Sequence, residues 1–171
     1  MTLRRATWKA ASWLPVWWVT NDVLVSVSPV EGTCMQPVLN PAPPRDHVLV
    51  NRLAPRLYQF RRGDIVTAQA PDGSGRKVVV KRLVALEGDS VRHRETGRVV
   101  RVPRGHCWLE GDSTRGSRDS GSDYGAVPLG LIEGRVMEVV WPLNRCGKLR
   151  AVQGSGWPQQ GRVIVGGSGQ V

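Results

Sequence analysis

Apolar and polar residues alternate in short runs through the middle of the chain, between residues 47 and 142. Gly, Pro and Asp separate the runs, and no long apolar stripe at helical spacing or repeat of fixed period interrupts them. We therefore expect a mostly β fold, a coiled antiparallel β-sheet or barrel-like assembly. The expected strands lie in HVLVNRL (47–53), DIVTAQA (64–70), VVVKRLVAL (78–86), SVRHR (90–94), GRVVRVP (97–103), HCWLEGD (106–112) and GRVMEVVWP (134–142).

The N-terminal pattern is different, because apolar residues dominate from residue 10 to residue 28. This stretch is just long enough to cross a bilayer, so we expect one N-terminal transmembrane helix. Asp22 would cost roughly 2.5–3.5 kcal/mol at the centre of such a helix, unless it faces a partner or lies off-centre. Arg4, Arg5 and Lys9 precede the span and would stay on the positive side of the membrane. A cleaved signal peptide is the alternative, but no A-x-A site follows the run.

These patterns divide the chain into four parts. Residues 1–9 form a basic flank, residues 10–28 the anchor, and residues 29–150 one domain of ordinary size. Residues 151–171 are rich in Gly, Gln and Ser, and we expect a flexible tail there despite its short RVIV run.

The charge of the chain raises the possibility of a nucleic-acid-binding domain. The formal net charge is +10, but the arginines are dispersed among apolar segments and form no block. One Phe and two Tyr offer little for base stacking, although Trp residues are available. We therefore expect no nucleic-acid partner, and salt-sensitive binding to DNA or RNA would reverse this interpretation.

Cysteine and histidine spacing gives no sign of a metal site or of a disulfide framework. The cysteines, Cys34, Cys107 and Cys146, are odd in number and form no CxxC pair, and the histidines are scattered. We expect neither a metal nor a cofactor.

Reactive side chains stand at the ends of the expected strands, in GTCMQP, RRGDIV, VVVKRLVALEGD and GDSTRGSRDSGSDYGAVP. Lys81 follows three valines, so its amine faces either the core or an apolar wall. Desolvation there would lower its pKa and fit it to act as a general base. Alternatively, its stem crosses the apolar surface and the ammonium reaches water.

Taken in order, EGTCMQPVLNP, RRGDIV, KRLVALEGD and EGDSTRGSRDSGSDYGAVPLGLI resemble the successive boxes of type I signal peptidases, the serine/lysine membrane proteases. The resemblance covers roughly residues 30–149 and the N-terminal anchor. MQPVLNP, VPRGHCWLEGD and the ending VVWP resemble the mitochondrial branch of that family more than the bacterial one.

The resemblance implies roles for particular residues. Cys34 falls at the family's nucleophile and Lys81 at its general base. Ser117 matches a serine that orients the lysine, and Asp119 matches a structural aspartate. In the family, the oxyanion is held by the nucleophile's backbone N–H and a neighbouring donor. Supporting residues in the same boxes are Gly32, Met35 and Arg82.

The chain departs from the bacterial pattern at three positions. Gly32 replaces a hydroxyl residue near the oxyanion, and Gly121 replaces an arginine beside the aspartate; both fit the mitochondrial branch. Cys34 replaces the serine. Its larger sulfur displaces the attacking atom, and a misplacement near 1 Å costs on the order of a hundredfold. However, a thiol ionises more readily than a hydroxyl, so a Cys/Lys pair is chemically competent.

The resemblance therefore implies a membrane-anchored endopeptidase of the mitochondrial inner membrane, with its catalytic domain facing the intermembrane space. Its substrates would be the N-terminal sorting signals of imported proteins, and its partners would be membrane lipid and a homologous second subunit. A catalytically silent scaffold subunit is the alternative, and restoring serine at Cys34 would distinguish the two.

Overall fold

The computed structural model describes residues 12–13, 24–72, 77–113, 118–149 and 162–164. The fold is mostly β, as the alternating pattern predicts, and every expected run from residue 47 to residue 142 contains a strand. The strands are β1 (Val25–Pro29), β2 (His47–Asn51), β3 (Ile65–Gln69), β4 (Val78–Ala85), β5 (Ser90–Arg92), β6 (Val99–Arg101), β7 (His106–Glu110), β8 (Val127–Pro128), β9 (Ile132–Trp141), β10 (Gly147–Lys148) and β11 (Val163–Ile164). The helical turns are α2 (Leu53–Arg56), η2 (Ser120–Tyr124), η3 (Leu129–Leu131) and η4 (Leu143–Arg145).

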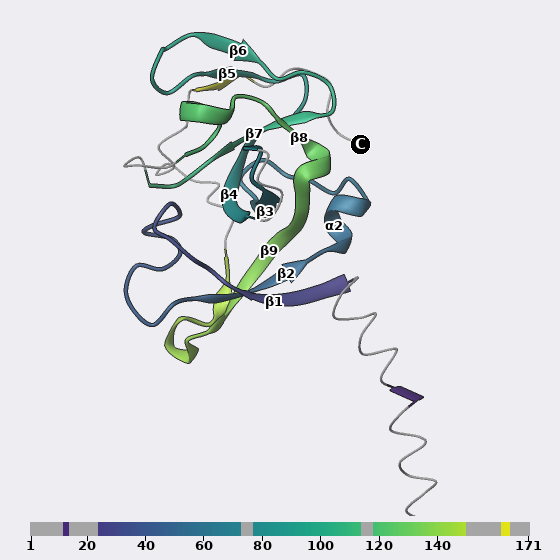
Figure 1. The fold of residues 1–171 in the computed structure, drawn as a ribbon, viewed down its shortest axis with the longest axis vertical. Helices are drawn as coiled ribbons and strands as arrows, with labels where there is room; N and C mark the ends of the chain where they lie inside the picture. The colour runs from purple at the N-terminus through teal and green to yellow at the C-terminus, as the bar shows by residue number, and fades with distance from the viewer. Residues whose placement is uncertain (1–11, 14–23, 73–76, 114–117, 150–161, 165–171) are drawn as a thin grey trace, which may run out of the picture.

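The strands form two antiparallel sheets. The larger has eight strands in the order β1-β2-β9-β3-β4-β7-β8, with β10 added to β9. The smaller has the order β11-β5-β6. Figure 1 shows β1 and β2 at one end of the molecule and the β5–β6 hairpin at the other, with β3 and β4 between them. Strands β3 and β4 therefore form the middle of the fold.

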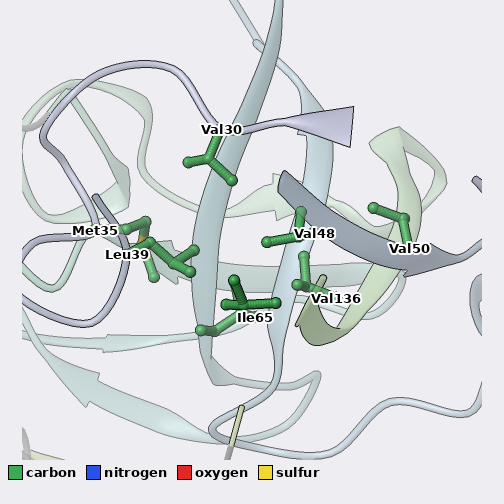
Figure 2. Close-up of a cluster of buried hydrophobic side chains, with 8 residues drawn as sticks. Val30, Met35, Leu39, Val48, Val50, Ile65 and Val136 are labelled. Atoms are coloured by element: carbon green, nitrogen blue, oxygen red, sulfur yellow. The ribbon is translucent and has the colours of Figure 1, made fainter. Parts of the chain in front are cut away.

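Alternation is clearest in β2, where every second residue is buried, and in the first half of β9, where Ile132, Gly134 and Val136 are buried. Strand β3 is instead buried at four of its five residues and β4 from Lys81 to Ala85, in the middle of the sheet. Figure 2 shows the core cluster nearest the N-terminal strands, in which side chains of the loop after β1 meet those of the sheet. Its buried members are Val30, Met35, Leu39, Val48, Val50, Ile65, Val136 and Val139.

The structure corrects the boundary of the expected N-terminal helix. Residues 25–28, expected at the end of the anchor, belong to β1, which pairs along its whole length with β2. All five residues of β1 are half-buried or exposed, and Val27 is 56% exposed, so pairing with β2, and not burial of an apolar face, holds this strand. Residues 10–11 and 14–23 of the expected anchor lie outside the described residues. In the part of the chain that is described, no helix is long and apolar enough to cross a membrane.

The expectation for the C-terminal tail is wrong at the RVIV run. Val163 pairs with Val91 and Ile164 with Ser90, so β11 becomes the third strand of the smaller sheet. The Arg162 side chain reinforces this pairing, because its Nε and Nη2 donate to the Arg92 carbonyl over 3.0 and 2.6 Å. The β-branched residues of the run thus find a partner strand that composition alone does not reveal.

Candidate active site

Lys81 lies in the middle of β4, opposite Val66 of β3, with only 4% of its surface exposed. Burial disfavours the ammonium and lowers the pKa of Lys81 below its ordinary value. The nearby Cys34 and Asp119 act in the opposite direction, through their negative charge when ionised, and Arg94 adds to the lowering. The amine is thus desolvated, which is the first of the two environments that the run of valines allows.

Cys34 lies in the loop between β1 and β2, and the structure brings it against β4. Its Sγ donates to the Val80 carbonyl at 3.6 Å, so the thiol contacts the residue that precedes Lys81. Its own carbonyl accepts from the Ser113 N–H at 2.9 Å, beyond the end of β7. The next side chain, Met35, is buried in the core cluster of Figure 2 and anchors the loop to the sheet. Cys34 and Lys81, distant in sequence, are therefore neighbours.

A buried polar clamp fixes the ends of this loop. The Asn40 side chain donates to the Val30 and Gly32 carbonyls at 2.7 and 3.2 Å, and its Oδ1 accepts from the Asp46 N–H at 2.8 Å. Asp46 is fully buried and accepts from both the Asn40 N–H and the Arg145 guanidinium. The loop therefore keeps one conformation despite its polar backbone.

Asp119 stands at the N-terminus of η2 and is almost fully buried, at 1% exposed. Its carboxylate accepts from the Gly121 N–H at 2.9 Å and from the Gly111 N–H at 3.0 Å, which ties η2 to the end of β7. Asp119 is thus both a helix cap and a fixed negative charge near Lys81. Ser117, expected to orient the lysine, lies outside the described residues.

The contacts of the supporting residues Arg82 and Gly32 stabilise the fold around the site. Arg82 is buried and forms a two-pronged pair with Asp112, at 2.7 and 2.6 Å, while Nη1 donates to the Gly63 carbonyl. Gly32 has φ of +84°, and a Cβ there would meet nothing within 4 Å, so the backbone conformation selects glycine and steric crowding does not.

Asp64, which the sequence also places at a strand end, stabilises a turn. It accepts from the Arg61 N–H at 2.9 Å and lies 3.8 Å from Arg135. Desolvation raises its pKa, and the neighbouring arginines oppose that shift.

A cleft of about 630 Å³ opens along Cys34 and Lys81. The stretch of β4 from residue 78 to residue 81 lines it, together with Arg118 and Tyr124. β4 pairs with β7 only from Arg82 onward, so the stretch before Arg82 can present its edge to the cleft. An extended chain lying there would pass the thiol and the amine together.

Two residues near the site, Arg94 and Glu110, were not predicted from the sequence. Arg94 and Glu110 lie in runs that look like ordinary strands, yet Glu110 is fully buried and Arg94 donates to it at 2.8 Å. No local pattern identifies them, because the pair joins two different sheets.

The three thiols are all free but differ in their surroundings. Burial raises the pKa of Cys107 to about 12, so this thiol is inert. Cys146 is exposed, with its Sγ directed to the Val140 carbonyl at 2.9 Å. Only Cys34 combines partial exposure, a cleft and a desolvated amine, an arrangement suited to nucleophilic attack on an acyl group.

Comparison with known proteins agrees with these features. The family described as signal peptidase, peptidase S26, matches residues 5–101, which include Cys34 and Lys81. Mitochondrial inner membrane protease subunit 2 of Mus musculus is 43% identical over 136 residues, covering 77% of this chain and 75% of the relative. The Saccharomyces cerevisiae protein of the same name is 36% identical, covering 84% and 83%. Mitochondrial inner membrane protease subunit 1 of Homo sapiens is 38% identical, covering 70% and 72%.

Proposed function

The chain belongs to the signal peptidase family, peptidase S26, and we propose that it is a membrane-anchored endopeptidase in which Cys34 is the nucleophile and Lys81 the general base. The observation that carries the proposal is the contact of the Cys34 thiol with β4 beside a buried Lys81 whose pKa burial lowers. A neutral amine next to a thiol can accept its proton, which a charged lysine cannot.

The reaction proceeds in two steps. Neutral Lys81 takes the proton of the Cys34 thiol as sulfur attacks the carbonyl carbon of the substrate, and the tetrahedral oxyanion is held by the Cys34 backbone N–H and a neighbouring donor. The C–N bond then breaks, and the ammonium of Lys81 gives its proton to the departing amine. A thioester remains on Cys34. Water attacks it after losing a proton to Lys81, which releases the acid and returns the proton to sulfur.

The substrate is an extended peptide that pairs with β4 before Arg82. Backbone pairing to a strand edge binds many sequences, while side chains that point alternately toward the cleft give specificity. The cleft brings the peptide past Thr33 and Cys34. Small side chains on either side of the cleaved bond suit shallow pockets, and sorting signals at the N-termini of imported proteins are the proposed source.

The proposed location follows the names of the relatives, which are mitochondrial inner membrane proteases. An apolar segment over residues 10–23 would anchor the chain, with Arg4 and Arg5 in the matrix and the catalytic domain in the intermembrane space. Those relatives are named as subunits, so a homologous second subunit is the proposed partner.

Cys34 in place of the family's serine also favours a second function, that of a silent subunit which stabilises an active homologue. The two functions differ in one result. If the chain is a scaffold with an intact site, Cys34→Ser creates cleavage that the natural chain lacks. If Cys34 is the nucleophile, the natural chain cleaves already.

The test is a peptidase assay on the full chain in detergent, alone and with its homologous subunit, using peptides that carry a sorting signal. Cys34→Ala and Lys81→Ala are expected to lower kcat on the order of a thousandfold or more without unfolding the chain. Cys146→Ser and Lys148→Ala, which alter an exposed thiol and an exposed amine, are the matched controls and should cleave normally. Normal cleavage by Cys34→Ala would refute the proposal.

A further inference from the structure

Two buried carboxylates lie close to each other near the Lys81 site: Asp119, which interacts with Lys81, and Glu110, which pairs in register with the next residue, Arg82. Glu110 is fully buried at the end of β7, and Asp119 is 1% exposed at the start of η2. Both approach the same point, because a Cβ added to Gly121 would lie 3.1 Å from Glu110 Oε1 and 3.3 Å from Asp119 Oδ1. Two negative charges this close and this dry need cationic partners.

Arg94, from the hairpin between β5 and β6, reaches both carboxylates. Its Nη2 donates to Glu110 Oε2 at 2.8 Å and to the Gly111 carbonyl at 3.4 Å, while Nη1 lies 3.8 Å from Asp119 Oδ2. The guanidinium is itself mostly buried. A planar fork with several donors suits this bridging position better than a single ammonium does.

The C-terminal strand supplies the second cation. Arg162, just before β11, donates to both oxygens of Glu110 at 3.2 Å, and the Trp108 indole donates to Oε1 at 2.7 Å. Glu110 is therefore neutralised from the side of the smaller sheet, and Arg94 can serve Asp119 as well. Charges alternate from Lys81 through Asp119, Arg94 and Glu110 to Arg162.

We propose that Arg94 is a positioning residue of the Lys81 site: by bridging Glu110 and Asp119 it fixes the Asp119 carboxylate and offsets the negative charge that Lys81 faces. Its catalytic consequence rests on the proposed peptidase function, but its electrostatic effect on Lys81 does not. The charged and titratable groups that act on Lys81 are Cys34 from the loop after β1, Asp119 at the N-cap of η2, Arg94 from the β5–β6 hairpin and Lys77 just before β4. The positive charge of Arg94 disfavours the ammonium and lowers the pKa of Lys81, whereas the negative charge of Asp119 favours the ammonium and raises that pKa.

The test is NMR titration of Lys81 in the full chain, with ¹³C at the lysine side chains, in detergent micelles. The lysines are Lys9, Lys77, Lys81 and Lys148, and Lys81→Met assigns the signal of interest. Arg94→Gln is expected to raise the pKa of Lys81, because it removes a positive charge and leaves Asp119 uncompensated. Arg94→Lys should give a smaller rise. Arg98→Gln, an equal charge change at an exposed position of the same hairpin, should leave the pKa unchanged.

Equal Lys81 pKa values in Arg94→Gln and Arg98→Gln would overturn the proposal. If Arg94→Gln fails to fold, the Lys81 pKa is compared between Arg94→Lys and Arg98→Lys. A higher Lys81 pKa in Arg94→Lys supports the proposal, and equal values contradict it.

The titration requires no activity, so it separates this inference from the proposed peptidase function. Where cleavage is found, the acidic limb of the pH profile of kcat/KM should shift to higher pH in Arg94→Gln, by as much as the Lys81 pKa rises. Below that limb, kcat/KM falls on the order of tenfold for each unit of the rise. The Lys81 pKa could rise in Arg94→Gln while the acidic limb of kcat/KM stays at the same pH. That result would show that Arg94 has no role in catalysis and acts on Lys81 only electrostatically.

Discussion

Lys81 is the residue whose environment differs most from that of an ordinary surface lysine. Burial removes water from the ammonium, and the sulfur of Cys34 and the Asp119 carboxylate only partly replace it. The three valines before Lys81 made a desolvated amine one of two possibilities, the other being an ammonium that reaches water, and the 4% exposure of Lys81 agrees with the first. The sequence cannot predict Arg94 or Glu110, whose effect on the site depends on contacts between β7 and the hairpin of the smaller sheet.

Replacing Lys81 by methionine should stabilise the fold while it abolishes cleavage. In the folded chain the pKa of Lys81 is lowered, so below that pKa the folded state carries a poorly solvated charge that the unfolded state hydrates. This penalty is complete below the folded pKa and disappears as pH rises toward the unfolded value of about 10.5. The stability gain of Lys81→Met should therefore be largest at low pH and shrink as pH rises. Urea unfolding of the solubilised full chain at several pH values measures it, with Lys148→Met as control; a gain that grows with pH would contradict the account.

Cys34 should be the thiol that reacts first in the folded chain. Iodoacetamide should alkylate it well before Cys107, whose pKa burial raises to about 12. It should also precede Cys146, which is exposed but directed to the Val140 carbonyl. Peptide mass spectrometry over a pH series gives the three rates, and alkylation of Cys34 should stop cleavage. Labelling of Cys34 no faster than in the urea-unfolded chain, with cleavage intact after alkylation, would show that Cys34 is not the nucleophile.

Among the elements, the loop between β1 and β2 determines where the nucleophile lies. The Asn40–Asp46–Arg145 clamp closes the loop, and Met35 fixes its middle in the core. The strands around it were predictable, since their alternation follows directly from one buried face. The end of the anchor was not, because β1 follows Val23 and Leu24 directly, with no Gly, Pro or Asp between them to mark a boundary. The short strands β8, β10 and β11 give too little pattern to be recognised.

Arg145→Met should loosen this loop. It removes the guanidinium from the buried Asp46 carboxylate and from the Val38 carbonyl, so the free energy of unfolding should fall by about 1–3 kcal/mol. kcat should fall too, because the position of Cys34 becomes less defined. Urea unfolding and the peptidase assay measure the two effects. Arg101→Met changes an exposed arginine of β6 and is the control; equal behaviour of the two variants would show that the clamp contributes nothing.

For the whole molecule, the correction at β1 changes where the chain can be shortened. A chain that begins at Leu24 keeps β1 and its pairing with β2, so it should fold and leave membranes on carbonate extraction. A chain that begins at Pro29 loses that strand and should unfold more easily, because β2 becomes an edge and nearby core residues are exposed. The full chain should stay with the membrane. Its release by carbonate as readily as the Leu24 chain would mean that residues 10–23 do not anchor it.

The central claim for the whole molecule is that Cys34 carries the acyl group during cleavage. The direct measurement is intact-protein and peptide mass spectrometry of the full chain, quenched in acid while it turns over a sorting-signal peptide. The account predicts a mass increase equal to the N-terminal product less one water, located on the peptide that contains Cys34 and removed by hydroxylamine as expected of a thioester. Cys34→Ala should show no adduct, and Lys81→Met should show almost none. Cleavage at a normal rate with no adduct on Cys34, or with an adduct on another residue, would contradict it.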